Sequence, residues 1–473
     1  MGRPRRRLVQ PKLPNDLNAP LQQMRYYSQL QKCMEYKDKC TYPPDKVYTD
    51  AEVLSLTPDD LYKWMSFRVY GTEDPNPQSK PLLRSPSVEY WKKSISYFMN
   101  TTSKWTDGVD GARGHGNATQ SKRVNNLINA VKRAETRGTG QETVADRAFT
   151  IVEFRQILDL SSTRHKAMAT FQYHLIGRCD DTAHVKKEVL KASTEFPDFL
   201  TTKISWSKNV DNAQDCPNQI MIPSMDSKTC VYLHLALWLE SWIQSGDRSL
   251  SQWLFVDGMT TRESPIDAQD KEAIAGKKLY SLAVSKASKS ASFTRCQALG
   301  NLGSHSIRKL AASECRRRGV PKDDVDYRAR WKIKRMQDRY VDIQLTWPDM
   351  NAASMLCQGG ACKYAAKRNA GLTDEWISSN VAVGITRVFG AKIGAILGKV
   401  LLWACFDIEW QERVPVDIRH HAVSKFLLLQ RNADNDYNPI ERIECIASEG
   451  RFSSLVVDLE LVDWFRSKRQ KTL

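Results

Sequence analysis

Residues 303–340 read GSHSIRKLAASECRRRGVPKDDVDYRARWKIKRMQDRY. This stretch holds twelve Arg or Lys residues against five Asp or Glu residues. Such a crowd of cations predicts a surface that meets phosphate. The same stretch contains, in order, His305, Arg308, Trp331 and Tyr340. This ordered set of a histidine, an arginine and two aromatic residues suggests chemistry on the bound phosphate.

The spacing of two residues in this stretch, and three polar residues before it, extend the pattern. His305 and Arg308 are three residues apart, so on a helix they share one side. Upstream, the sequence GRCDD contains Arg178, followed three residues later by Asp181, which is able to orient its neighbours. Lys208 stands at the end of an expected strand, where its side chain can swing over a bound nucleic-acid strand.

These residue types match what is needed to break a DNA strand without a metal. Negative charge grows on the non-bridging phosphate oxygens, and the planar fork of arginine binds such oxygens in pairs. A lysine whose pKa is lowered by neighbouring cations can protonate the leaving oxygen. A tyrosine phenol can attack phosphorus and form a covalent intermediate.

Two positions have competitors. Tyr327 is a second candidate for the nucleophile, although it precedes Trp331. Lys203 is a second candidate for the proton donor, on the same expected strand as Lys208. Being five residues apart, these two lysines would face opposite sides of a regular strand.

The totals of the chain agree with a nucleic-acid partner. Its 473 residues favour two or three domains. The net charge is +16 and the sequence pI is about 9.3, which favours a polyanionic partner, nucleic acid first and an anionic membrane second. The most apolar stretch (383–407) contains Arg387, Lys392 and Lys399, so we expect a buried helix there and no membrane span.

Cysteine usage and the first residues bear on the cellular compartment. The eleven cysteines are scattered, odd in number and without a CxxC pair, so a reduced intracellular protein is expected and a zinc site is not. The opening MGRPRRRLVQPK is basic and resembles a disordered arm. It suits nuclear import or a non-specific DNA contact, and a merely solvated tail is the other interpretation. The expected location is the nucleus.

The first part of the chain predicts several helices. TPDDLYKWMSF (57–67) has a capped helix start, and the turn formers of 71–81 predict a linker. A helix is expected over 85–99, with Ser87 as its cap. After the glycine-rich loop 108–120, residues 121–138 carry one apolar stripe, made by Val124, Leu127, Ile128 and Val131.

Basic residues lie mostly away from that stripe. The loop and helix together (113–137) hold six Arg or Lys residues and one Glu. A solvated charged face is the ordinary interpretation of such a pattern, and contact with the DNA backbone is the functional one. The predicted DNA-binding residues are Lys122, Arg123, Lys132, Arg133 and Arg137.

A second periodic region begins with the helical pattern of 149–161. We expect a long helix over 168–190, and then a hairpin of two strands, 199–208 and 218–224. A further helix is expected over 228–246. The region therefore predicts a mostly helical domain with a small antiparallel sheet.

Taken in order, these residues resemble the tyrosine recombinase (lambda-integrase-like) family. Its signature is Arg, a hairpin Lys, HxxR, His or Trp, and then Tyr. The chain is most similar to the Crypton-type recombinases of eukaryotic mobile elements, over roughly residues 85–410. The stretches that carry this resemblance are YWKKSISYFM, GNATQSKRVNNLI, WSKNV, GSHSIRK, RWKIKRMQDRYVD and WPDMNAASMLCQGGACKY.

The resemblance implies a role for each residue. Tyr340 would be the nucleophile that takes the 3′-phosphate and frees a 5′-hydroxyl. Arg178 and Arg308 would hold the non-bridging oxygens. Lys208 would protonate the leaving 5′-oxygen. Neither a metal nor a nucleotide cofactor is implied.

The remaining site residues have supporting roles in the same comparison. His305 would assist proton transfer or donate a hydrogen bond to the phosphate. Trp331 would occupy the position where relatives carry His or Trp. Asp181 would match an acidic residue that supports the site. Taken alone, His305 would more often be a structural histidine, and Trp331 a core aromatic.

The fold implied is mainly α with a small antiparallel sheet, arranged as a C-shaped clamp on duplex DNA. The expected parts are a basic arm and helical extension (1–80), a helical core DNA-binding domain (81–145), a catalytic domain (146–365) and a C-terminal helical extension (366–473). The resemblance also implies a homotetramer on two DNA sites. The last part suits contacts between protomers, although its apolar helix near 393–406 is equally suited to the chain's own core.

Three functions stay open at this point. The first is a site-specific recombinase of a mobile element, and the second is a type IB topoisomerase that nicks and closes DNA as a monomer. The third is a transposon-derived DNA-binding protein that no longer cuts. The target DNA sequence is not predicted, because base choice depends on the few side chains that reach the groove edges and on DNA deformability.

Overall fold

The structure is a computed structural model of the chain. It describes residues 21–76, 78–99, 103–108, 114–142, 146–206, 216–244, 252–255, 268–298, 300–331, 346–366, 372–431 and 457–461. The chain forms two compact units, unit 1 (Met1–Val144) and unit 2 (Ala145–Leu473). The structure is mainly helical (59% helix) and contains a small three-stranded antiparallel sheet. These two features agree with the predicted class.

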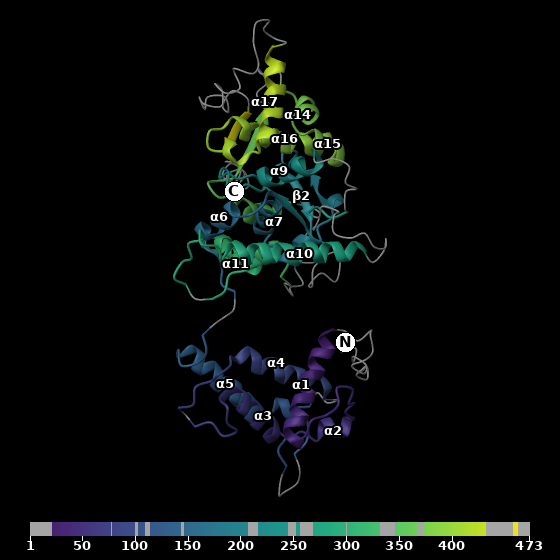
Figure 1. Cartoon of the computed structure of the whole chain (residues 1–473), viewed down its shortest axis with the longest axis vertical. Coiled ribbons are helices and arrows are strands. Elements are labelled where there is room, and N and C mark those ends of the chain that lie inside the picture. The colour runs from purple at the N-terminus through teal and green to yellow at the C-terminus, as the bar shows by residue number, and fades with distance from the viewer. Residues whose placement is uncertain are drawn as a thin grey trace, which may run out of the picture. The chain divides into compact units, whose positions relative to one another are not determined.

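Unit 1 is a small helical domain (Figure 1). Its elements are α1 (Leu21–Asp38), α2 (Asp50–Leu54), α3 (Pro58–Tyr70), α4 (Ser85–Phe98), the 3-10 helix η1 (Ala118–Gln120) and α5 (Lys122–Thr136). Residues on both sides of the expected linker 71–81 share one hydrophobic core, in which the rings of Trp64 and Trp91 lie 5.5 Å apart. The predicted helical extension and core DNA-binding domain therefore pack together within unit 1.

The helix α5 begins and packs as its sequence predicts. The Ser121 hydroxyl accepts a hydrogen bond from Val124 N at 3.3 Å and caps the helix. The four residues of the expected stripe are buried: Val124, Leu127, Ile128 and Val131. The polar residues between them are thereby turned toward solvent.

The predicted cap of α4 is wrong. The helix starts at Ser85, two residues before Ser87, because Pro86 occupies its first turn. Proline suits this position, where a helix N–H has no intrahelical partner. Ser85 N and Ser85 Oγ both donate to Glu135, at 2.6 and 3.0 Å, and this joins the start of α4 to the end of α5.

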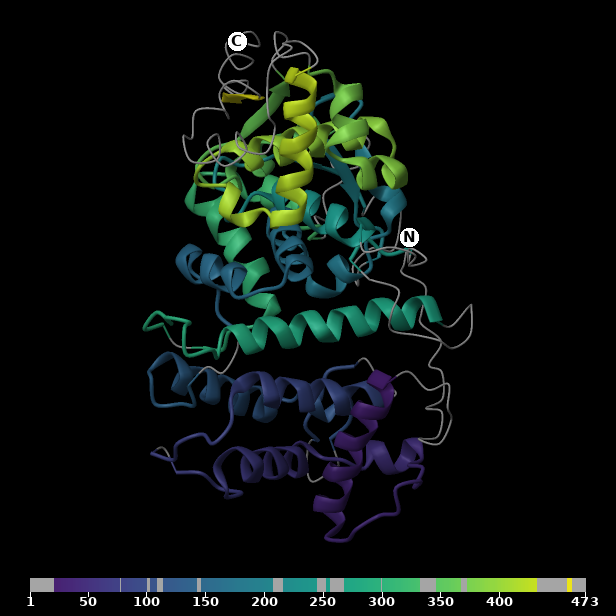
Figure 2. The same ribbon diagram turned by 45° about the horizontal axis from the view of Figure 1, so that its top comes forward.

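Unit 2 contains the remaining elements. Its helices are α6 (Ile151–Asp159), α7 (Thr163–His174), α8 (Cys179–Ala183), α9 (Val231–Gln244), α10 (Ala268–Ala287), α11 (Ser304–Arg317), α12 (Lys322–Arg328), α13 (Met350–Met355), α14 (Asp374–Asn380), α15 (Val383–Phe389), α16 (Ala391–Phe406) and α17 (Val416–Arg431). Its strands are β1 (Lys191–Ala192), β2 (Leu200–Lys203), β3 (Asn218–Met221), β4 (Cys362–Ala366) and β5 (Val457–Leu461). Within this unit, α10 is a long helix that runs along one face (Figure 2).

The strands β1, β2 and β3 form the antiparallel sheet in that order. The pairing of β2 with β3 confirms the predicted hairpin, but both strands are shorter than expected and end at Lys203 and Met221 rather than at 208 and 224. The register of this hairpin pairs Leu200 with Met221 and Lys203 with Asn218. A second, two-stranded sheet pairs β4 with β5, which lies far along the chain. The sequence pattern does not predict this second pairing.

The long helix expected over 168–190 is wrong, since two helices occupy that range. The first, α7, ends at His174, and the second, α8, begins at Cys179. Between them Ile176 has a φ of 47°, in the left-handed region that ends a helix. Gly177 N then donates to Gln172 O at 2.9 Å.

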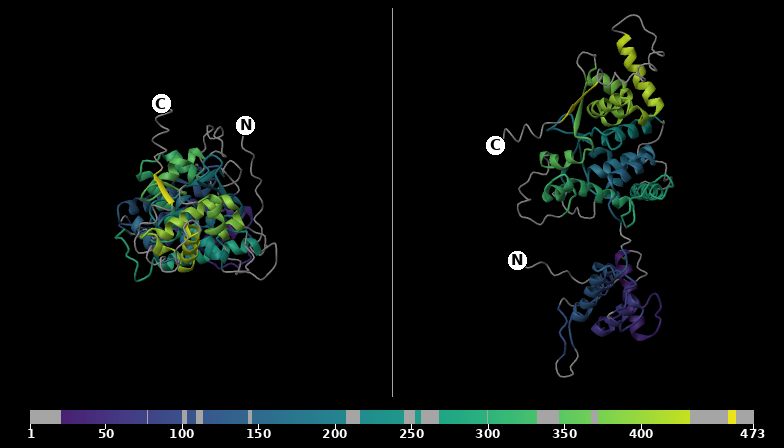
Figure 3. Two further views of the ribbon diagram at one scale, coloured as in Figure 1. Left: turned by 90° about the horizontal axis from the view of Figure 1, so that it is seen from above. Right: turned by 90° about the vertical axis from the view of Figure 1, so that its left-hand side faces the viewer.

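The apolar stretch 383–407 likewise forms two helices, α15 and α16, separated by Gly390 with a φ of 85°. Side chains of α16 belong to the same hydrophobic core as those of α7, α9 and α11. The helices α14 to α17 gather at one end of unit 2 (Figure 3). In this structure α16 therefore lies in the chain's own core.

Candidate phosphate-binding site

The break between α7 and α8 positions the first predicted site residue. Arg178 is the residue that precedes the first turn of α8. Its backbone N–H donates to Asp181 Oδ2 at 3.1 Å, which is the reciprocal bond of a capped helix start. The continuous helix predicted over 168–190 would not place Arg178 at a helix end. The break that the prediction missed is therefore the feature that positions this site residue.

The carboxylate of Asp181 lies at the centre of three guanidinium groups. Its Oδ2 lies 3.5 Å from Arg308 Nη1, 3.4 Å from Arg330 Nη2 and 4.0 Å from Arg178 Nη1. The side chain of Asp181 is only 1% exposed. Three cations thus face a single buried carboxylate, and the cluster keeps an excess of positive charge.

Arg308 is a buried member of this cluster, and its guanidinium is hydrogen-bonded through one terminal nitrogen. Its Nη2 donates to Ala329 O at 2.7 Å. Among the described residues, its Nη1 has no hydrogen-bond partner, although Asp181 lies 3.5 Å away. Burial and the neighbouring Arg330 and Arg178 lower the pKa of Arg308 to about 9, against the opposing effect of Asp181. An incoming anion would offset this crowding of cations.

Arg330 is a residue that sequence reasoning missed. It is buried, and its Nη1 donates to Leu175 O at 3.3 Å and to Gln219 Oε1. Its φ of 55° is in the left-handed region, which costs a side-chain-bearing residue about 1–3 kcal/mol. The sequence holds no signal that separates Arg330 from the other cations around it.

His305 and Trp331 lie at the solvent side of the cluster. Both are exposed, and the Trp331 ring centre lies 5.6 Å from Arg308 Cζ, within range of a cation–π contact. Partial desolvation by the residues beside its ring, followed by the charges of Lys309 and Arg308, lowers the pKa of His305 below its usual 6.5, while Asp146 opposes the shift. Its imidazole is therefore mainly neutral at pH 7 and has both an acceptor and a donor nitrogen.

The start of α11 is anchored to the helices beside it. Gln172 Nε2 donates to Ser304 O at 2.8 Å, and Gln172 Oε1 accepts from Tyr280 of α10 at 2.7 Å. The hydroxyls of Ser281 and Ser304 lie 3.3 Å apart, and Ser281 also lies 3.2 Å from Cys179 Sγ. These bonds fix the helix end from which His305 and Arg308 project.

Arg328, two residues before Arg330, attaches the hairpin to the same region. Arg328 is completely buried, forms an ion pair with Asp349, and donates to His174 O at 2.7 Å and to Ile220 O at 3.0 Å. Gln219 Nε2 donates to Arg328 O at 2.8 Å. The strand β3 is therefore bound directly to the segment that carries Arg328 and Arg330.

Two of the predicted catalytic residues lie outside the described residues, namely Lys208 and Tyr340. Their competitors are described. Lys203 ends β2 and is half-buried. Tyr327 lies in α12 and is half-buried as well. The structure thus brings together Arg178, Asp181, His305, Arg308 and Trp331.

The predicted DNA-binding residues lie on α5 and at its end, and all five side chains are exposed: Lys122, Arg123, Lys132, Arg133 and Arg137. Two of them form ion pairs. Arg123 Nη1 lies 2.7 Å from Asp59 Oδ1, and Lys132 Nζ lies 2.5 Å from Glu89 Oε1. On contact with DNA, Arg123 and Lys132 would have to leave these carboxylates before they could pair with a phosphate.

The remaining observations concern metal ions, membranes and similarity to known proteins. Within the described ranges, no group of three or more His, Cys, Asp or Glu side chains is placed to hold a metal ion. None of the helices in the same ranges combines the length and the apolar character of a membrane-spanning segment. No protein-family model matches the chain, and no curated protein matches its sequence.

Proposed function

We propose that this protein is a site-specific DNA recombinase of a mobile element, which cuts and rejoins DNA through a 3′-phosphotyrosine. The single observation that supports this most is the cluster of Arg178, Arg308 and Arg330 around Asp181. Its excess positive charge and the unused Nη1 of Arg308 suit a phosphodiester. Planar guanidinium groups bind phosphate oxygens in pairs, and they act most strongly where water is excluded.

The proposed reaction exchanges one phosphate ester for another. The Tyr340 phenol gives its proton to the His305 imidazole or to water, and its oxygen forms a bond to phosphorus. The bond between phosphorus and the 5′-oxygen breaks. Lys208 gives a proton to that leaving oxygen. Arg178 and Arg308 stabilise the charge that grows on the non-bridging oxygens. The 5′-hydroxyl of another strand reverses the reaction, so the bond energy is kept in the phosphotyrosine and no ATP is required.

His305 and Trp331 complete the proposed site. A neutral His305 can take a proton or donate a hydrogen bond to a phosphate oxygen. The indole N–H of Trp331 is a second donor, and the ring covers the Arg308 guanidinium. The buried Asp181 and Arg330 act as positioning residues.

The proposal includes a larger assembly. The two units would close as a C-shaped clamp around a duplex, with α5 of unit 1 and the arginine cluster of unit 2 toward the DNA. Four copies would join two DNA sites and exchange strands, in the nucleus of a eukaryotic host. The resemblance to Crypton-type recombinases and the net charge of +16 support this part.

The alternatives predict different products, so one experiment separates them. Two labelled duplexes with the junctions of the mobile element are incubated with the full chain in EDTA. Joined products support the recombinase. Relaxation of plasmids without sequence preference supports a topoisomerase, and tight binding without nicking supports a DNA-binding protein. Arg308→Ala is expected to abolish cutting, while Arg317→Ala, an exposed arginine of the same helix, is expected to cut normally.

A further inference from the structure

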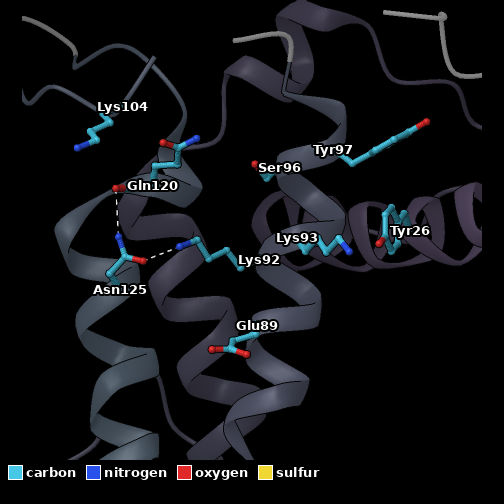
Figure 4. A pocket seen from close by; sticks show the side chains of 9 residues that line it. All are labelled: Tyr26, Glu89, Lys92, Lys93, Ser96, Tyr97, Lys104, Gln120 and Asn125. Carbon is cyan, nitrogen blue, oxygen red and sulfur yellow. Dashed lines mark hydrogen bonds between the residues drawn. The ribbon is translucent and has the colours of Figure 1, made fainter. Parts of the chain in front are cut away.

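Unit 1 has a pocket that the proposed reaction does not use. It has a volume of about 540 Å³, within the range of about 300–1,000 Å³ that is usual for ligand pockets, and it opens to solvent. Its lining comes from α1, α4, η1, α5 and the segment 103–108 (Figure 4). The lining residues are Tyr26, Glu89, Lys92, Lys93, Ser96, Tyr97, Lys104, Gln120 and Asn125.

The charge of the pocket favours an anion. Within the described part of the chain, none of the ammonium groups of Lys92, Lys93 and Lys104 forms an ion pair. Glu89, the one carboxylate in the lining, is paired with Lys132 at 2.5 Å. Lys92 Nζ donates to the neutral amide oxygen of Asn125 at 2.5 Å, and burial lowers the pKa of Lys92. Three lysines line the pocket against this one carboxylate, whose charge raises the Lys92 pKa and so opposes the effect of burial. The lining therefore keeps an excess of positive charge.

The polar side of the pocket is held in place before any ligand binds. Asn125 Nδ2 donates to Gln120 O at 3.2 Å, as Figure 4 shows beside Lys92. Lys104 forms a backbone bridge with Asn117, whose side chain donates to Ser96 Oγ at 3.0 Å. The close approach requires Gly116, which has a φ of 106°, since a Cβ there would lie 2.3 Å from Lys104 O.

The other side of the pocket is aromatic. Tyr97 is 49% exposed, and its ring packs edge to face on Tyr26 with the centres 5.5 Å apart. Tyr26 is in turn buried against Tyr90, at 5.7 Å. The exposed ring thus rests on a fixed support beside the lysines. Exposed aromatic rings next to cations are the usual platform for an unstacked nucleobase and its phosphate.

We propose that this pocket binds a nucleotide whose base is not stacked in a duplex, with the phosphate on the lysines and the base on Tyr97. The inference deepens the proposed function, since exchange of strands between duplexes passes through unpaired nucleotides. A single-stranded segment of DNA and a free nucleotide share this chemistry. The five residues of the expected duplex contact do not line the pocket, although Lys132 borders it through its ion pair with Glu89.

The experiment compares a blunt labelled duplex with the same duplex carrying a short single-stranded tail, by fluorescence anisotropy with the full chain. The tail is expected to raise the affinity about tenfold through stacking and phosphate contact. The double variant Lys93→Gln/Lys104→Gln and the variant Tyr97→Leu are expected to remove this advantage and leave binding of the blunt duplex unchanged. The double variant is also expected to lower the salt slope for the tail by about 1.4.

Two controls make the test specific. Lys32→Gln removes an exposed charge of α1 outside the pocket, and Tyr97→Phe keeps the ring, so both are expected to keep the advantage of the tail. Competition by dAMP against the tailed duplex, but not the blunt one, would assign the pocket to mononucleotides as well. Equal wild-type affinity for both duplexes, or an advantage that survives in the pocket variants, would overturn the inference.

The inference and the proposed function would be contradicted by different results. A chain that binds blunt duplexes but gains nothing from a tail would contradict the pocket alone. A chain that binds tails through these residues but never cuts DNA would contradict the recombinase alone.

Discussion

Asp181 Oδ2 lies 3.5 Å from Arg308 Nη1, and both side chains are almost completely withdrawn from solvent. The pair joins the start of α8 to the N-terminal part of α11, two helices that are distant in the chain. Arg330 contacts the same oxygen, so one carboxylate orders the cations of the candidate site. Its removal would leave buried charges without a partner.

Asp181→Asn is therefore expected to destabilise unit 2 by about 3–5 kcal/mol, the usual cost of breaking a buried ion pair on one side. Urea denaturation measures this change. Asp180→Asn is the matched control, since the adjacent carboxylate is partly exposed and pairs with Lys277 at 2.7 Å. Its expected loss is below about 1 kcal/mol. Equal losses for the two variants would contradict the central role of Asp181.

Arg330→Lys keeps the charge and removes the planar fork that bonds Asp181, Leu175 and Gln219. If Arg178 and Arg308 hold the phosphate as proposed, their displacement is expected to slow single-turnover cleavage roughly 100-fold. The affinity for duplex DNA is expected to stay within a factor of two, because Arg330 is buried. Arg317→Lys is the control on the exposed face of α11. A parallel loss of affinity and cleavage would assign Arg330 a purely structural role.

The stability of unit 2 is expected to fall in mild acid. His234 is completely buried, and burial lowers its pKa to about 4 from 6.5. The unfolded chain binds this proton more tightly, so the contribution is complete above about pH 6.5 and is lost as the pH falls toward 4. His234 alone should change the free energy of unfolding by up to about 1.4 kcal/mol per pH unit in this window. Burial also lowers the pKa values of His165 and His174, which add to the slope.

His234→Gln is expected to reduce that slope, as measured by urea denaturation at several pH values. His420→Gln changes an exposed side chain, solvated in both states, and is expected to keep the wild-type slope. A slope that is the same in His234→Gln and the wild type would contradict the assignment to His234.

The salt dependence of duplex binding tests the expected role of α5. Lys122 is exposed and forms no ion pair among the described residues, whereas Lys132 is paired with Glu89. Lys122→Gln should reduce the slope of log affinity against log salt by about 0.9, the value of one phosphate contact. Lys132→Gln should reduce affinity less, since Lys132 must first leave Glu89. An unchanged slope in Lys122→Gln would place the duplex elsewhere.

Local patterns in the sequence predicted much of the secondary structure. The apolar stripe of α5 and the pairing of β2 with β3 were predicted because neighbouring residues determine them. The placement of His305 and Arg308 on one side of a helix could also be predicted, since residues three apart share a helix face.

The remainder depends on contacts between distant segments. The left-handed Ile176 that divides α7 from α8 has no side-chain signal in the sequence, and the same holds for Arg330. The pairing of β4 with β5 joins segments about ninety residues apart, beyond the reach of periodicity. Such features arise from tertiary packing, which a single sequence does not display.

The most direct test of the central claim is covalent trapping. The full chain is incubated in EDTA with nicked duplexes that carry the junctions of the mobile element, and adducts are resolved on a denaturing gel. Tyr327→Phe serves as the matched control for Tyr340→Phe. The account predicts an adduct on the 3′ side of the break with wild type and Tyr327→Phe, and none with Tyr340→Phe. An adduct that persists in Tyr340→Phe, or tight binding of wild type without any adduct, would contradict it.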